Sequence, residues 1–123
     1  MKNWSKSWNK SIKPRKQRLF VRNAPLHVKS KLMGSHLSKE LRVKYKSRAL
    51  RVRKGDKVKI LRGQFKGKTG SVERIDTKKQ SVFVTGIEIL KKDGSKTLYP
   101  LHYSNLLIIE LNVSDKFRLG EKK

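Results

Sequence analysis

Three glycines and three basic residues share one short stretch of the chain. The glycines can adopt the positive φ angles that tight turns need, and they let backbone N–H groups approach a phosphate; they are Gly63, Gly67 and Gly70. Such glycines also occur where the geometry of a turn alone requires them, and both roles can hold at once. The basic neighbours are Arg62, Lys66 and Lys68. Because these cations share the loop, the stretch favours contact with phosphate groups.

The sequence from Gly63 to Thr69 is similar to the nucleotide-binding P-loop motif. That motif needs four residues between its glycines, whereas three lie between Gly63 and Gly67. The following residues, Ser71 and Val72, favour a strand, so no helix N-terminus would face the phosphates. An NTPase site is therefore excluded.

Residues that carry catalytic or metal chemistry are sparse. The chain has no cysteine, which excludes disulfides, thiolate zinc sites and cysteine nucleophiles. Its histidines, His27, His36 and His102, have no carboxylate at ligand spacing, and Asp56 and Asp76 are too isolated for a metal-dependent nuclease site. We expect no enzyme activity, and no metal, cofactor or small-molecule substrate.

The net charge of the chain points to a polyanionic partner. Formal net charge is +24 over 123 residues, and residues 1–53 hold 17 Lys and Arg against a single acid. Such a chain repels itself, whereas a nucleic acid releases counterions when Lys and Arg approach its phosphates. A charge kept only for solubility is the alternative, but solubility surfaces mix both signs. Nucleic acid is therefore the expected partner.

No segment of the sequence is typical of a membrane protein. The longest apolar run, Leu106 to Ile109, has the length of a strand, and no signal-peptide core is found. Residues 1–23 are basic and free of acid, which is also typical of an organelle transit peptide. The residues alone leave this alternative to a cytoplasmic protein open.

The first part of the chain is predicted to form short helices. Pro14–Arg22 suits a helix because proline favours the first turn, and Ala24-Pro25 ends it. Leu26–Ser30 is predicted to be extended. Ser38 is predicted to cap a further helix over residues 39–46.

Two tryptophans, Trp4 and Trp8, stand one helical turn apart near the start of the chain. A helix would place both indoles on one face. A disordered tail is equally compatible with this spacing, as is an arm that orders on a partner by stacking on bases or filling a groove. Their role stays open.

From about Leu50 the hydrophobic pattern changes to the alternation of strands. Strands are predicted over residues 57–62, 69–75, 80–85, 86–91, 97–101 and 105–111. Asp93-Gly94 favours a tight hairpin between two of them. A mainly β fold with a small closed barrel follows, since closure leaves no exposed edge. The expected domains are a basic, partly helical extension (1–49), the barrel (50–112) and a C-terminal tail (113–123).

Two phenylalanines in this part of the chain have different expected environments. Phe65 lies in the loop between Arg62 and Lys66, where it can either stack on an RNA base or fold back on the barrel. Its position favours neither role. Phe83 lies within an apolar strand and is predicted to join the core.

The stretch from Arg53 to Gly86 resembles the KOW motif, an RNA-associated strand–loop–strand of ribosomal proteins and transcription elongation factors. The matching residues are Gly55-Asp56, Val58, Ile60, Gly63, Lys66-Gly67, Gly70 and Val72. In their order, further segments closely resemble large-subunit ribosomal protein 24 in its archaeal and eukaryotic form, number 26 in eukaryotic counting. These segments, within residues 14–118, are Lys16–Arg18, Asn23–His27, Leu37–Tyr45, Val52–Asp56, Lys92–Gly94 and Pro100–Asn105.

This resemblance implies an SH3-like barrel with a KOW motif and an N-terminal extension. It implies a structural, cytoplasmic, ribosome-bound protein that binds large-subunit rRNA of the 23S type near its 5′ end. It further implies action early in subunit assembly and a place near the exit of the peptide tunnel, beside neighbouring large-subunit proteins. It argues against a transit peptide, because the basic N-terminal segment matches the family.

The resemblance also carries RNA contacts onto this sequence. In the barrel they are Lys54, Lys57, Arg62, Lys66, Lys68, His102, Ser104 and Asn105. The extension and the residues just after it are predicted to add Lys13, Arg15, Lys16, Arg18, Arg22, His27, Lys29, Lys31, Arg42, Lys44, Lys46, Arg48, Arg51 and Arg53. Lys91 and Lys92 of the hairpin complete the set. The alternative is a KOW transcription factor that docks on RNA polymerase, but residues 1–49 are too short and too basic for the α/β domain that such proteins usually add.

Overall fold

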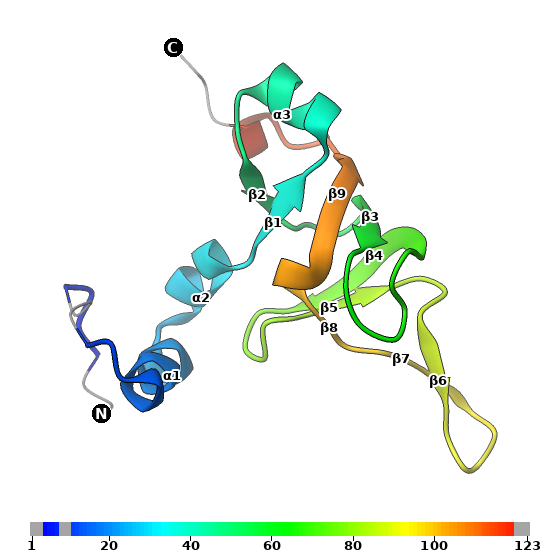
Figure 1. The fold of residues 1–123 in the computed structure, drawn as a ribbon, viewed down its shortest axis with the longest axis horizontal. Helices are drawn as coiled ribbons and strands as arrows, with labels where there is room; N and C mark the ends of the chain where they lie inside the picture. The colour runs from blue at the N-terminus through cyan, green and yellow to red at the C-terminus, as the bar shows by residue number, and fades with distance from the viewer. Residues whose placement is uncertain (1–3, 8–10, 120–123) are drawn as a thin grey trace.

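Strands carry more than half of the regular structure of the chain (Figure 1). The computed structural model describes residues 4–7 and 11–119. The strands are β1 (Gly34–Leu37), β2 (Ala49–Arg51), β3 (Lys57–Ile60), β4 (Thr69–Asp76), β5 (Ser81–Val84), β6 (Glu88–Leu90), β7 (Lys96–Leu98), β8 (Leu101–His102) and β9 (Leu106–Glu110). The helices are α1 (Pro14–Asn23), α2 (Leu26–Leu32), α3 (Lys39–Tyr45) and the 3-10 turns η1 (Tyr103–Asn105) and η2 (Lys116–Leu119). The mainly β class is therefore confirmed.

Seven strands form one open sheet, in the order β2-β1-β9-β3-β4-β5-β8. Neighbours pair antiparallel except β1 and β9, which are parallel. The sheet ends at β2 and β8, while β6 and β7 pair with each other and project from the body (Figure 1). The prediction of a closed barrel is thus wrong for the described residues. Pro100 has no N–H to continue a ladder, so the strand predicted over 97–101 divides there into β7 and the short β8.

The core is built from alternate residues of the strands. In β5, Val82 and Val84 are fully buried, so Phe83 between them faces the other way. There the guanidinium carbon of Arg74 lies 4.3 Å from the centroid of the Phe83 ring. The prediction that Phe83 joins the core is wrong, because a side-chain period of two places it on the face opposite the buried valines.

The segment that the sequence assigned to the extension contributes two strands to the sheet. β1 lies between β2 and β9, and its Ser35 and Leu37 are completely buried, as is Met33 just before the strand. The Ser35 hydroxyl donates a hydrogen bond of 2.5 Å to the Tyr103 carbonyl, which satisfies the buried oxygen. The expected boundary after residue 49 falls inside β2. Ser35 interrupts the apolar alternation that would predict a strand here, because only Met33 and Leu37 on the same face are apolar.

The two N-terminal helices meet at Pro25. α1 ends before Ala24, which is extended with ψ of 140°, as the sequence predicts. The N–H groups of Val28 and Lys29 both donate to the Pro25 carbonyl at 3.0 Å, so the proline that ends α1 also begins α2. The prediction that Leu26–Ser30 is extended is therefore wrong, because a proline suits a helix start, where no N–H partner is lost. In the described chain no helix is long and apolar enough to cross a membrane.

Local contacts fix two further N-terminal segments. Ser38 caps α3, as predicted, because its hydroxyl accepts the N–H of Leu41 at 3.4 Å. Trp4 packs on α1, with its ring centroid 5.1 Å from that of Phe20 and its Nε1–H donating to the Phe20 carbonyl at 3.2 Å. Trp8 lies outside the described residues, so a shared indole face stays a prediction.

A buried ion pair fastens the C-terminal segment to the sheet. Arg118, in η2, holds the carboxylate of Asp56 with its two Nη atoms at 2.6 and 2.5 Å, and both side chains are almost fully buried. The carboxylate also accepts the backbone N–H groups of Arg53 at 2.8 Å and Asn112 at 3.0 Å. A buried charge is tolerated when it is paired and hydrogen-bonded in this way, so Asp56 has a structural role that its isolation in the sequence does not indicate.

Candidate nucleic-acid interface

The cations of the sheet region are partly neutralised within the fold. In the part of the chain that the structure describes, ion pairs form between Arg53 and Asp115, Lys57 and Glu110, and Arg118 and Asp56. The hydrogen bond from Arg53 holds the pKa of Asp115 below its ordinary value. Arg53 and Lys57 are among the predicted RNA contacts, but each already faces an acid of its own fold.

The segment before β1 has no acid at all, since Glu40 is the first acidic residue of the sequence. Arg15, Arg18 and Arg22 are exposed and recur at spacings of three and four residues, so they lie along one face of α1. Lys16 is exposed beside them, and α2 adds Lys29. With no carboxylate nearby in the sequence, this positive charge is left for a partner to neutralise.

The predicted anion-binding loop is a hydrogen-bonded turn. Three of its N–H groups donate to carbonyls of the loop or of the strand before it: Lys66 to Gly63, Gly67 to Ile60 and Lys68 to Phe65, at 3.1, 2.8 and 3.1 Å. These donors are engaged within the fold. The side chains of Arg62, Lys66 and Lys68 are exposed, so a phosphate would meet side-chain cations here more readily than these three N–H groups.

Geometry distinguishes the glycines of this loop. Gly63 and Gly67 have φ of +94° and +88°, as the turn prediction requires. Gly70 has no positive φ; a Cβ there would stand 2.6 Å from the Thr85 carbonyl oxygen. The prediction of positive φ is therefore wrong for Gly70, whose missing side chain instead lets two strands approach.

Phe65 takes the second of its two expected roles. Its side chain folds back and is 8% exposed, with its ring centroid 5.2 Å from that of Tyr99. Lys68 Nζ lies over the ring, 5.3 Å from the centroid. The phenylalanine therefore anchors the loop to the core, and the cation beside it stays at the surface.

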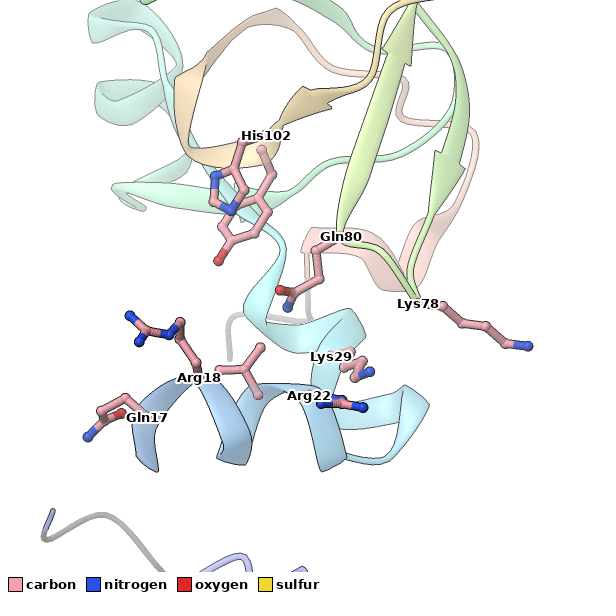
Figure 2. Close-up of a pocket in the computed structure, with 9 residues that line it drawn as sticks. Gln17, Arg18, Arg22, Lys29, Lys78, Gln80 and His102 are labelled. Carbon is pink, nitrogen blue, oxygen red and sulfur yellow. The ribbon is translucent and has the colours of Figure 1, made fainter. Parts of the chain in front are cut away.

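A pocket of about 510 Å³ lies where the two N-terminal helices face the β4–β5 turn and the start of η1 (Figure 2). Its cationic lining residues are Arg18, Arg22, Lys29 and Lys78. Its neutral lining residues are Gln17, Val21, Gln80, His102 and Tyr103. Figure 2 shows Gln80 reaching from the sheet toward the helices, while Lys78 extends outward at the rim. The volume falls within the range of about 300–1,000 Å³ typical of ligand sites.

Two aromatic rings form one wall of the pocket. The ring centroids of His102 and Tyr103 are 4.2 Å apart, with 32° between the ring planes. The backbone N–H of Ser104 donates to His102 Nδ1 at 3.3 Å, and the Ser104 hydroxyl lies 2.6 Å from the same atom. Because Nδ1 accepts a hydrogen bond, the neutral ring carries its proton on Nε2, which leaves an N–H donor for a ligand.

Gln80 is held in an unusual conformation beside this wall. Its φ is +56°, a region that residues other than glycine and asparagine seldom adopt. The Nε2 atom is buried and has no hydrogen-bond partner. An unsatisfied buried donor costs about 1–3 kcal/mol, so the amide is a group that an acceptor from outside the fold would stabilise.

The predicted contacts on the β6–β7 hairpin lie away from the pocket. Lys91 and Lys92 are on the projecting β6–β7 hairpin (Figure 1), whose Asp93-Gly94 turn forms as predicted, with φ of +82° at Gly94. In this turn the hydroxyl and the backbone N–H of Ser95 both donate to the Asp93 carboxylate. These hydrogen bonds lower the pKa of Asp93, and the one from the hydroxyl has the larger effect.

Other predicted cations belong to the α3 end of the sheet. Arg42 is half-buried, and its Nε donates to the Leu37 carbonyl at 2.8 Å. Lys44 Nζ lies over the ring of Tyr45, 5.5 Å from its centroid. Together with Lys46 and Arg48 these residues form a second basic area around α3, separate from the helices α1 and α2 (Figure 1).

Of the predicted RNA contacts, the fold brings Arg18, Arg22, Lys29 and His102 to one pocket. Sequence reasoning missed the neutral residues that line this pocket, above all Val21 and Gln80. A glutamine after Lys78-Lys79, at the start of the strand predicted over residues 80–85, carries no signal by itself, because only the packing of α1 and α2 opposite makes it part of a pocket. Within the described residues, no group of three or more His, Asp or Glu is placed to hold a metal ion.

Comparison with known protein families gives one match that spans nearly the whole chain. A family model for eukaryotic ribosomal protein L26 and its archaeal counterpart, large-subunit protein 24, matches residues 11–121. The matched range includes α1, α2, the glycine loop between β3 and β4, and the Arg118–Asp56 pair, whereas Trp4 lies before it.

Proposed function

Because the chain belongs to the family of eukaryotic ribosomal protein L26 and archaeal large-subunit protein 24, we propose that its unneutralised cations bind the RNA of the large ribosomal subunit. Family membership makes the protein a structural constituent of that subunit. The observation that carries the RNA-binding proposal is the charge distribution: the segment before β1 holds exposed Arg and Lys and no acid.

We further propose where this constituent acts. The resemblance to large-subunit protein 24 supports binding to 23S-type rRNA near its 5′ end, action early in subunit assembly, and a place near the exit of the peptide tunnel, in contact with neighbouring large-subunit proteins. The protein then works in the cytoplasm, bound to the ribosome. Its role is structural rather than catalytic, without a cofactor or a small-molecule substrate.

The two parts of the chain divide the work of binding in this proposal. β3, the glycine loop and β4 form the KOW strand–loop–strand, which presents Arg62, Lys66 and Lys68 from a hydrogen-bonded turn. The helices α1 and α2 lay their arginines and lysines along the RNA backbone. Cations of this kind contact phosphate and 2′-hydroxyl groups, so the protein reads the shape of folded RNA more than its sequence.

A competition experiment tests the proposed function. The full chain is bound to folded large-subunit rRNA and to an unrelated RNA duplex of equal length at the same salt concentration. We expect clear preference for the large-subunit rRNA, and co-sedimentation with large subunits in cell extract. Equal affinity for the two RNAs would contradict the proposal, and co-sedimentation with RNA polymerase would support the transcription-factor alternative.

A further inference from the structure

We propose that the pocket between the N-terminal helices and the sheet holds one unpaired nucleotide of the bound RNA, with its base inside and its phosphates on the surrounding cations. This inference rests on the RNA binding proposed above and adds a position at which the protein contacts a base. The pocket is the space lined by α1, α2, the β4–β5 turn, β8 and η1 (Figure 2).

The neutral groups of the pocket distinguish a base from a bare phosphate. A phosphate needs donors and positive charge, and it makes no use of Val21 or of the paired rings of His102 and Tyr103. A base does, because unpaired bases stack on aromatic side chains and on apolar surface. A basic pocket with an aromatic wall and an apolar side chain therefore fits a whole nucleotide.

Two hydrogen-bond donors of the pocket suit the edge of a base. Gln80 is half-buried, its Nε2 atom is buried without a hydrogen-bond partner, and its side chain reaches toward the helices (Figure 2). His102 offers Nε2–H, since its Nδ1 is occupied by Ser104. Base edges present carbonyl and ring-nitrogen acceptors, so a base would satisfy donors that the fold leaves over.

The cations around the pocket suit the linked phosphates on either side of that base. Arg18 and Arg22 are one helical turn apart on α1, and Lys29 faces them from α2. Lys78 stands at the rim and extends outward (Figure 2). A base inside with charges outside matches a nucleotide turned out of a loop or bulge, the form in which RNA bases are usually read.

A blocking variant tests the inference with the full chain. Val21→Trp fills the pocket from α1 without removing a charge, and Gln80→Asn withdraws the amide while keeping a residue that tolerates positive φ. Val113→Trp is the matched control, since Val113 is 50% exposed in the segment after β9, outside both the pocket and the predicted RNA contacts. Far-UV circular dichroism checks that each variant is folded, and binding to folded large-subunit rRNA is measured over a series of KCl concentrations.

We expect Val21→Trp and Gln80→Asn to weaken binding, with a loss of about tenfold or more for the blocked pocket, the size expected when one stacked base is lost. The dependence on salt should stay unchanged, because no phosphate contact is removed. The control should bind like the unaltered chain. Affinity unchanged in both pocket variants would overturn the inference, as would a loss that appears only as a lower salt slope.

Photo-crosslinking gives a readout that does not depend on any variant. The complex of the full chain with large-subunit rRNA is irradiated at a wavelength that bases absorb, and the linked peptides are identified by mass spectrometry. We expect a base attached within His102–Tyr103 or at Gln80. Crosslinks confined to the glycine loop or α3 would overturn the nucleotide pocket while leaving RNA binding intact. A chain that shows no preference for this RNA would instead contradict the proposed function itself.

Discussion

The sheet and the N-terminal helices handle positive charge in opposite ways. In the sheet and the C-terminal segment, Lys57 faces Glu110 and the buried Arg118 faces Asp56, so the fold neutralises part of its own charge. In α1 and α2 no residue is buried, and no acid precedes Glu40 in the sequence. The position of the acids, more than the total charge, therefore indicates which cations are left for RNA.

The largest expected loss of stability comes from removing the buried ion pair that joins η2 to the sheet. Arg118→Met leaves the Asp56 carboxylate buried without its cation, so we expect a loss of about 3–5 kcal/mol in the free energy of unfolding. Urea unfolding followed by far-UV circular dichroism measures it. The control Lys57→Met removes an exposed pair and should cost less than about 1 kcal/mol. Equal losses in the two variants would show that the Arg118–Asp56 pair does not hold the C-terminal segment on the sheet.

Gly70→Ala separates a structural glycine from a phosphate-binding one. Its Cβ would stand 2.6 Å from the Thr85 carbonyl oxygen, so the strands must shift at a cost of about 1–3 kcal/mol. Gly63→Ala, with φ of +94° but open space around the Cβ, should cost about 1–2 kcal/mol. The measurement is again urea unfolding. RNA affinity of the folded Gly70→Ala protein should be unchanged; a loss of affinity without a loss of stability would assign the glycine to phosphate contact.

Single lysines on the two sides of the comparison should differ in their salt dependence. Lys16→Gln removes a cation with no acid nearby, so the slope of log affinity against log salt should fall by about 0.7–0.9. Lys57→Gln should change the slope much less, because Glu110 already faces that lysine at 3.0 Å. Filter binding of large-subunit rRNA over a series of KCl concentrations gives both slopes. A larger change in slope for Lys57→Gln than for Lys16→Gln would contradict the proposal that the N-terminal helices carry the charge left for RNA.

Lowering the pH should change the stability of the sheet region, because all acidic residues follow β1 in the sequence. The hydrogen bond from Arg53 holds the pKa of Asp115 below its ordinary value in the folded state. This stabilisation is present above the unfolded-state pKa of about 3.9 and is lost as pH falls through the lower folded-state value. Arg53→Gln should therefore flatten the dependence of the melting temperature on pH below about pH 4, by a small amount because the pair is partly exposed. An unchanged pH profile would show that the pair contributes nothing.

Much of the local structure could be predicted from single residues. Pro14 at the start of α1, the Ser38 cap of α3 and the Asp93-Gly94 turn are confirmed, because each depends on neighbours in the sequence. The predicted strand spans also match closely from β3 to β6 and in β9. These features are local, so the sequence pattern contains the information that determines them.

Features that depend on distant segments were not predictable in the same way. β1 contains Ser35, whose burial makes sense only with the Tyr103 carbonyl opposite. The open sheet depends on which distant strands pair: β2 and β8 end it, so edges remain where a closed barrel was predicted. The pocket joins Arg18 to His102 across most of the sequence. Its neutral residues carry no charge pattern, so only the packing of α1 and α2 identifies them.

RNA binding by this chain should depend most on where its unneutralised charge lies. Two variants of equal net charge test it, each with four cations changed to Gln. One changes Arg15, Lys16, Arg18 and Arg22 of α1. The other changes cations outside the N-terminal helices: Lys39 of α3, Lys57 and Lys59 of β3, and Lys96 of β7. The salt dependence of binding to large-subunit rRNA is measured for both. We predict that the slope falls by about 3 for the α1 variant, from about 0.7–0.9 per contact, and by less than about 1 for the other. Equal changes in slope would contradict the claim, because they would mean that total charge, and not the acid-free helices, determines binding.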